Sequence, residues 1–251
     1  MIGKINNGAN LYLDTRCEIF IDYDNLLPSQ KTAGILDVVT KTLIQMPFGV
    51  AATRVKCEVR VYGGWYEGAT MTRLAQDVTV EIQRDFPKIT RLPIGGGGHR
   101  VVSVNAELAV ALIEEPGHHL FNTYRRKGKP ANVRVEEPTV VGCTDPDCVL
   151  PLMEKLLRTG NCPKPGCGVA VGDLVYRDEQ KIVDTMLSCD MIYAADNGAN
   201  HIVLVSGDDD FLPPLRTVLL RGTAAVRFHP KPNFQRASFP QGGAALLERD
   251  L

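Results

Sequence analysis

The sequence lacks any apolar run that approaches the length of about 18 residues needed to cross a membrane, so we expect no membrane contact. It also lacks a charge imbalance, because 28 Lys and Arg residues balance 29 Asp and Glu residues, and the net charge is -1. Without a global basic field, any binding of phosphates must come from local basic segments. The amino-terminal segment has no apolar core of the kind a signal peptide needs. These absences predict an intracellular, cytoplasmic protein.

The chain does contain enough apolar sequence for a sizeable core. Its 251 residues are 44% hydrophobic, which fits one large domain or one domain with a small module. The seven cysteines are an odd number. This count fits an intracellular chain with metal-binding or catalytic cysteines better than a disulfide framework.

The stretch 201–222 combines a predicted buried strand, an acidic turn and a predicted helix. After the β-branched run at 202–205, the next residues are Ser206, Gly207, Asp208, Asp209 and Asp210. A strand, a turn and a helix form half of a parallel α/β unit, and such sheets bind ligands beyond the carboxyl ends of their strands. The alternative is a helix cap with solvated acids, because Asp is favoured at helix starts.

Two further segments place acids in similar positions. A predicted strand at 17–21 ends in Asp22, and Asn25 follows three residues later. Ordinary turn chemistry also explains Asp and Asn there. Asp184 falls within the apolar stripe of a helix predicted over 176–195, where a carboxylate is costly unless it is paired or binds a metal. Lys181 is its candidate partner, and Asp190, about 120° farther round the helix, is expected to be a supporting or structural acid.

Four cysteines form two evenly spaced pairs, each separated by four residues: Cys143 with Cys148, and Cys162 with Cys167. Tetrahedral Zn²⁺ takes four thiolates from two such turns, so we expect a structural zinc site in a module inserted at 140–170. Coincidental pairs of free thiols are the alternative. The remaining cysteines lie in apolar segments and are expected to be buried: Cys17, Cys57 and Cys189.

Basic and aromatic segments are candidates for contacts with nucleic acid. The loop predicted over 121–135 and the segment 211–236 each carry five Lys or Arg residues and no acid. Solvated surface charge is the alternative for both. Trp65 and Tyr66, in a predicted loop, are candidates for stacking on a base, with ordinary packing as the alternative. The predicted substrate-binding residues are Arg125, Arg126, Lys127, Lys181 and Arg216.

Three segments together resemble the signature segments of NYN domains, which are PIN-like nuclease domains that include the bacterial LabA-like group. They are Ile-Phe-Ile-Asp-Tyr-Asp-Asn at 19–25, Lys-Ile-Val-Asp with a later Asp at 181–190, and Leu-Val-Ser-Gly-Asp-Asp-Asp-Phe-Leu-Pro-Pro-Leu at 204–215. The resemblance implies a PIN-like three-layer α/β fold, with a central, mainly parallel sheet flanked by helices. It implies a single domain over 1–251 that carries the cysteine module as an insert.

The resemblance also implies a metal-dependent nuclease that hydrolyses phosphodiester bonds, with single-stranded or structured RNA as its substrate. One or two Mg²⁺ or Mn²⁺ ions would activate the attacking water. Asn25 and Ser206 would fix the geometry or contact the phosphate, and Asp209 is expected to point away. The implied metal ligands are Asp22, Asp184, Asp208 and Asp210.

Two other functions stay open at this point. A PIN-like fold with a zinc module also suits a non-catalytic module that binds nucleic acid or protein. The run from Asp22 to Leu26 comes near the Asp-x-Asp pattern of Mg²⁺-dependent phosphatases, although Leu26 replaces the usual Thr or Val. A homo-oligomer and a protein partner at the zinc module are both left open.

Overall fold

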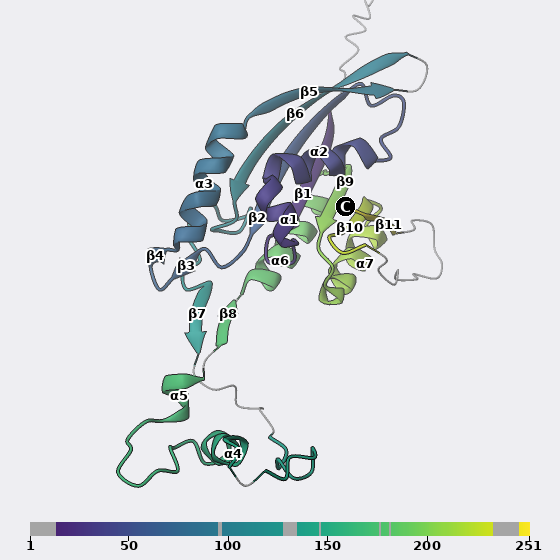
Figure 1. The fold of residues 1–251 in the computed structure, drawn as a ribbon. Coiled ribbons are helices and arrows are strands. Elements are labelled where there is room, and N and C mark those ends of the chain that lie inside the picture. The colour runs from purple at the N-terminus through teal and green to yellow at the C-terminus, as the bar shows by residue number, and fades with distance from the viewer. Residues whose placement is uncertain are drawn as a thin grey trace, which may run out of the picture. The chain divides into compact units, whose positions relative to one another are not determined.

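The computed structural model describes residues 14–94, 97–127, 135–145, 147–175, 177–180, 182–232 and 246–251, without the side chains of 125–127 and 177–180. The chain divides into two compact units (Figure 1). The first unit comprises Met1–Thr123 and Ile182–Leu251, and the second comprises Tyr124–Lys181. The second unit contains the range 140–170 marked by the cysteine spacing and extends beyond it at both ends.

The first unit is built on a mostly parallel seven-stranded sheet with the strand order β11-β10-β9-β1-β2-β6-β5. β1 lies at its centre and pairs in parallel with β2 and β9, whereas β5 runs antiparallel to β6. The strands are β1 (Thr15–Asp22), β2 (Arg54–Tyr62), β5 (Lys88–Ile94), β6 (Gly98–Leu108), β9 (His201–Val205), β10 (Ala224–His229) and β11 (Leu247–Asp250).

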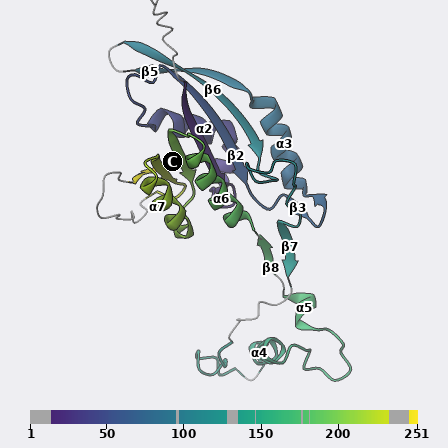
Figure 2. The same ribbon diagram turned by 180° about the vertical axis from the view of Figure 1, so that it is seen from behind.

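Helices cover both faces of this sheet, as the two opposite views show (Figures 1 and 2). Because side chains alternate along a strand, Ile19 and Ile21 of β1 pack in one hydrophobic cluster with α2 and α3, while Phe20 packs in another with α6 and α7. The predicted α/β class with a mainly parallel sheet is confirmed, and the arrangement is compatible with three layers. The helices are α1 (Pro28–Ala33), α2 (Ile35–Gln45), α3 (Arg73–Asp85), α6 (Val183–Asp196) and α7 (Leu212–Leu220).

Two local predictions for the first unit are wrong. The helix expected over 31–46 is two helices, because Gly34 between them has φ 94°, a conformation that side chains disfavour. The stacking role considered for Trp65 and Tyr66 is also wrong, and the packing alternative is correct, since both side chains are buried next to the short pair β3 (Tyr66–Glu67) and β4 (Thr70–Met71). Trp65 Nε1 donates to the Val61 carbonyl at 3.0 Å. Neither ring is placed to stack on a base.

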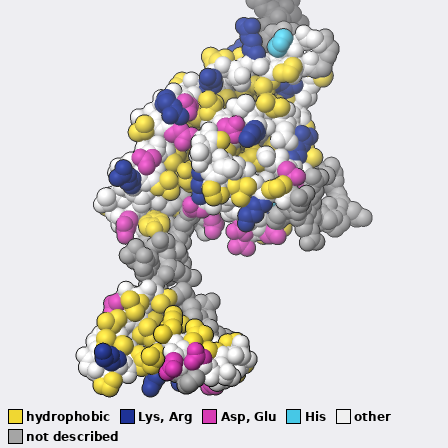
Figure 3. Space-filling model, viewed as in Figure 1, with side chains coloured by type: hydrophobic (Ala, Val, Ile, Leu, Met, Phe, Trp, Pro, Cys, Tyr) yellow, Lys and Arg dark blue, Asp and Glu magenta, His cyan; other side chains and the backbone are white. Residues whose placement is uncertain are grey.

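The second unit has much less regular structure among its described residues. Its elements are β7 (Tyr124–Lys127), α4 (Leu150–Thr159), α5 (Val171–Leu174) and β8 (Arg177–Gln180), with β7 antiparallel to β8. The basic segment predicted as a loop over 121–135 therefore contains a strand, β7. Hydrophobic side chains gather on the surface of this unit (Figure 3), including the exposed Leu152 and Met153 of α4.

The cysteines outside this unit follow the prediction in part. Cys17 and Cys57 are buried as expected, whereas Cys189 is exposed on α6, so that expectation is wrong. The buried face of α6 is formed by other residues of the helix, and Cys189 lies on its exposed face. The apolar periodicity of the sequence did not show on which face Cys189 lies. Within the described parts of the chain, no helix is both long and apolar enough to cross a membrane.

Candidate functional site

The candidate site begins where two neighbouring parallel strands end. Ile21 of β1 lies opposite Val205 of β9, so the residues that follow them, Asp22 and Ser206, are neighbours at the carboxyl edge of the sheet. Ser206 Oγ donates to Asp22 Oδ2 at 2.8 Å, and Asn25 Nδ2 donates to the same oxygen at 2.6 Å. Asp22 itself is only 4% exposed. The structure thus brings together three of the residues predicted from the sequence.

The acidic turn after β9 is held by its own side chains. Ser206 Oγ accepts a hydrogen bond from the Asp208 N–H at 3.1 Å, and Asp208 Oδ1 accepts one from the Asp210 N–H at 3.0 Å. Asp208 therefore caps the short 3₁₀ helix η1 (Asp209–Phe211) that leads into α7. The helix-cap interpretation of this turn is therefore correct for Asp208. The carboxylate of Asp210 has no part in this cap.

Asp184 lies in a different setting from the one predicted. Helix α6 begins at Val183 and not near residue 176, and Asp184 is an exposed residue of its first turn. The prediction of a carboxylate inside the apolar stripe is therefore wrong. The pKa of Asp184 is raised by partial burial and then by the carboxylates of Asp208 and Asp210. These charges act on one another, so the three predicted segments contribute acids to one region.

Asp22 is the most perturbed acid of this region. The pKa of Asp22 is raised from 3.8 to about 6, mainly by burial and also by the negative charges of Asp184 and Asp24. The hydrogen bonds from Ser206 and Asn25 act in the opposite direction but are weaker than burial. The carboxylate form of Asp22 is therefore costly unless a positive charge is supplied.

Three neighbouring acids have a cation of their own. Asp209 lies 3.0 Å from Arg227 Nη1, Asp24 lies 3.8 Å from Lys31 Nζ, and Asp190 lies 2.7 Å from Arg60 Nη1. By contrast, no Lys or Arg of the described residues is within ion-pair distance of the four predicted metal ligands. Those four are Asp22, Asp184, Asp208 and Asp210.

Arg227 is a residue of this region that the sequence interpretation assigned wrongly. It belonged to the basic segment 211–236, for which phosphate contacts and solvated surface charge were the two interpretations, but it is fully buried in β10. Its Nε donates to the Ser206 carbonyl at 3.1 Å and its Nη1 to Asp209 at 3.0 Å. Arg227 therefore holds the acidic turn from inside the protein. The signal for this role was its place within the apolar strand 224–228.

The predicted substrate-binding residues are only partly described. Arg216 is half-buried on α7, in the same unit as the acids. Arg125, Arg126 and Lys127 form most of β7 in the second unit, but their side chains lie outside the described residues. Lys181, the candidate partner of Asp184, lies outside them altogether. For these five positions the substrate-binding role stays a prediction.

The described residues give partial geometric support for a metal site. Among the described residues, no three His, Cys, Asp or Glu side chains are grouped closely enough to hold an ion as they stand. In the second unit, Cys143 and Cys148 share a thiol hydrogen bond, and the Leu150 N–H donates to Cys148 Sγ at 3.5 Å. These bonds lower the pKa of the Cys148 thiol. Cys162 and Cys167 are free thiols on a separate turn.

Comparison of the chain with protein-family models, with curated proteins and with solved structures found no match. The functional interpretation therefore depends on the residues of this chain.

Proposed function

We propose that this chain is a metal-dependent nuclease of the NYN group of PIN-like domains and that it hydrolyses phosphodiester bonds in RNA. The observation that carries the proposal is the charge around Asp22. This carboxylate is buried at the carboxyl edge of a parallel sheet, its charged neighbours are other acids, and its pKa is raised to about 6. Groups with such perturbed pKa values cluster at functional sites.

The donors at this edge fit a hard divalent cation. They are carboxylates from three separate segments, and Mg²⁺ and Mn²⁺ prefer oxygen ligands. Both hydrogen bonds to Asp22 reach Oδ2, and no donor of the described residues contacts Oδ1. An ion held by Asp22, Asp184, Asp208 and Asp210 would offset their repulsion and would supply positive charge and an acidified water.

The other residues of the site have positioning roles. Ser206 connects the strand ends, because its hydroxyl donates to Asp22 and accepts from the Asp208 N–H. Asn25 holds the second hydrogen bond to Asp22. Arg227 pairs with Asp209, whereas Asp208 and Asp210 on the same turn have no Lys or Arg within ion-pair distance among the described residues. In the first unit, substrate contacts would come from Arg216.

The test is cleavage of labelled single-stranded RNA and DNA in Mg²⁺, Mn²⁺ or EDTA. We expect RNA cleavage that EDTA abolishes and that Asp208→Asn with Asp210→Asn lowers by more than about a hundredfold. Asp209→Asn is the matched control, since it removes the same charge from an acid already paired with Arg227, and Arg227 keeps the buried Glu248 at 3.5 Å as a second carboxylate. Cleavage that survives the double substitution would refute the assignment.

Two other outcomes separate the competing functions. Metal-dependent release of phosphate from p-nitrophenyl phosphate, without cleavage of either polymer, would favour a phosphatase. Binding of RNA without cleavage in any metal would favour a non-catalytic module.

We also propose that Cys143, Cys148, Cys162 and Cys167 hold a structural Zn²⁺ ion. The paired thiols of Cys143 and Cys148, with a backbone N–H donating to sulfur, fit half of such a site. Elemental analysis of the purified chain is expected to find one zinc per chain. Cys162→Ser should remove the zinc, whereas Cys189→Ser, at an exposed cysteine of α6, should keep it. A folded second unit without zinc would contradict this proposal.

A further inference from the structure

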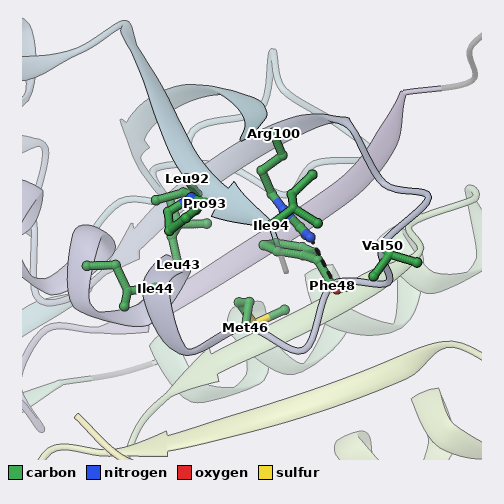
Figure 4. Close-up of a pocket in the computed structure, with 9 residues that line it drawn as sticks. All are labelled: Leu43, Ile44, Met46, Phe48, Val50, Leu92, Pro93, Ile94 and Arg100. Carbon is green, nitrogen blue, oxygen red and sulfur yellow. Dashed lines mark hydrogen bonds between the residues drawn. The ribbon is translucent and has the colours of Figure 1, made fainter. Parts of the chain in front are cut away.

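We propose that a pocket at the other edge of the sheet binds a small organic anion in which a carboxylate is joined to a compact apolar group. The pocket lies between α2, the loop after it, and the ends of β5 and β6, and its volume is about 250 Å³ (Figure 4). Asp22 and Tyr62 pair at the carboxyl ends of β1 and β2, whereas Arg100 precedes Val101, which pairs with Arg54 at the start of β2. The pocket and the acids therefore lie at opposite ends of the parallel strands.

The side chains that line the pocket are apolar except for that of Arg100, while polar atoms form about as much of the pocket surface as apolar atoms do. Val50 at the rim is 75% exposed, and Ile44 is also exposed. Figure 4 shows Arg100 reaching from β6 toward Phe48 among these side chains. An apolar lining with few polar groups is typical of sites for small molecules. The apolar walls are Leu43, Ile44, Met46, Val50, Leu92 and Ile94.

Arg100 is a buried cation whose contacts are all uncharged. It is 6% exposed, and its Nη2 donates to the carbonyls of Phe48 and Gly49 at 3.3 Å each. Its guanidinium carbon lies 4.9 Å from the centroid of the Phe48 ring. Nη1 is buried and has no hydrogen-bond partner among the described residues. Two long hydrogen bonds and a ring face compensate a buried charge only in part.

The other two buried arginines show what Arg100 lacks. Arg60 is equally buried and pairs with Asp190 at 2.7 Å, and Arg227 pairs with Asp209 at 3.0 Å. Within the described part of the chain, no carboxylate lies within ion-pair distance of Arg100. Buried arginines are rarely left without a counter-ion. The missing acid in the pocket is therefore the feature that a bound anion would supply.

The size of the pocket limits the ligand. Sites for drug-sized molecules have volumes of about 300–1,000 Å³, and this pocket is smaller. A nucleotide would not fit inside it, and inorganic phosphate would leave the apolar walls without contacts. A monocarboxylate with a short alkyl chain satisfies both the charge of Arg100 and the walls.

Calorimetric titration of the full chain in EDTA with hexanoate tests the proposal. We expect hexanoate to bind at least about tenfold more tightly than hexanamide, because charge-assisted hydrogen bonds are roughly twice as strong as neutral ones. Each methylene added from butanoate to hexanoate should tighten binding by up to about fourfold. Binding of hexanamide or inorganic phosphate as tight as that of hexanoate would overturn the proposal, and so would a lack of hexanoate binding.

Two pairs of variants locate the site. Arg100→Met should weaken hexanoate binding at least about tenfold, whereas Arg91→Met, at an exposed position of β5 outside the pocket, should not. Val50→Asp places a negative charge on the exposed rim and should also weaken binding, while the neutral Val50→Asn should weaken it less. The Val50 pair decides the question if Arg100→Met does not fold. Equal affinities within both pairs would place the ligand elsewhere and overturn the proposal.

Discussion

Two carboxylates of the first unit are buried to a similar degree, but their surroundings differ. Asp22 is 4% exposed and Asp190 is 1% exposed. Asp190 accepts hydrogen bonds from Arg60 Nη1 and from the Tyr62 hydroxyl, both at 2.7 Å, and from the Ile113 N–H at 2.8 Å. Burial raises the pKa of Asp190 as well, but the Arg60 cation and the hydrogen bonds from the Ile113 N–H and the Tyr62 hydroxyl act against this rise. Asp190 thus belongs to a structural network, as a paired and fully hydrogen-bonded acid.

Asp22 has no such cation in the part of the chain that the structure describes. Its donors are the uncharged Ser206 and Asn25, and the charges that act on it come from the acids Asp184 and Asp24. Among the described residues, one buried acid is thus paired with arginine and the other has only acids as charged neighbours, which is the setting that the proposed cation would complete. The comparison separates a buried acid that stabilises the fold from one that costs stability and suits a functional site.

The largest expected effect is on the paired acid. Asp190→Asn removes the buried counter-ion of Arg60 and leaves its guanidinium with only the exposed Glu107, 2.9 Å from Nε. We expect a loss of about 3 kcal/mol in the free energy of unfolding. Urea unfolding followed by the fluorescence of Trp65, the single and buried tryptophan, measures the first unit. A loss below about 1 kcal/mol would mean that Asp190 is not the partner that keeps Arg60 stable in the core.

At Asp22, substitution by Asn is expected to raise the free energy of unfolding. Its folded pKa of about 6 lies above the ordinary value of 3.8, so its ionisation destabilises the fold, fully above pH 6 and not below pH 3.8. In metal-free buffer at pH 8, Asp22→Asn should therefore stabilise the protein by up to about 3 kcal/mol. The gain should shrink toward zero as the pH falls to about 4. Paired urea titrations of the two proteins across this range measure it, and a destabilised variant at pH 8 would contradict the comparison.

The strand ends of the site could be predicted from the sequence because the signal there is local. Apolar β-branched runs mark strands buried on both faces, and the first polar residues after them mark the edge. Asp22 and Ser206 were found in this way, and the parallel pairing of β1 with β9 then makes them neighbours. Even the competing interpretation as a helix cap had a local cause, since Asp208 does cap η1.

The rest of the region depends on pairings between distant parts of the sequence. Arg60 and Asp190 are 130 positions apart, and no local pattern indicates that they meet. For the same reason Arg227 was taken for a surface cation. Asp184 was misplaced because apolar periodicity does not show where a helix begins. Its helix starts only after Ile182, whose φ of 59° interrupts the regular backbone.

Mn²⁺ from solution should stabilise the region around Asp22, where the described residues supply no cation. At a Mn²⁺ concentration 100 times its dissociation constant, the free energy of unfolding should rise by about 2.7 kcal/mol. Asp208→Asn with Asp210→Asn should abolish this rise, whereas Asp209→Asn should keep it, because Asp209 is occupied by Arg227. Urea titrations with Mn²⁺ and with EDTA measure the difference. An equal rise in all three proteins would place the ion away from these acids.

The smallest effect is expected at Asp24, which lies between Asp22 and Asn25 in sequence but is exposed and has Lys31 at 3.8 Å. Surface ion pairs contribute about 0–1 kcal/mol, so Asp24→Asn should change the free energy of unfolding by less than that. It should leave RNA cleavage within about twofold, because the acid already has a cation and its loss removes only a distant repulsion from Asp22. Cleavage assays and urea titrations beside Asp22→Asn measure both quantities. A large loss of cleavage would show that a carboxylate near this edge of the sheet contributes to cleavage even when it is paired with a cation. The distinction between paired and unpaired carboxylates would then fail.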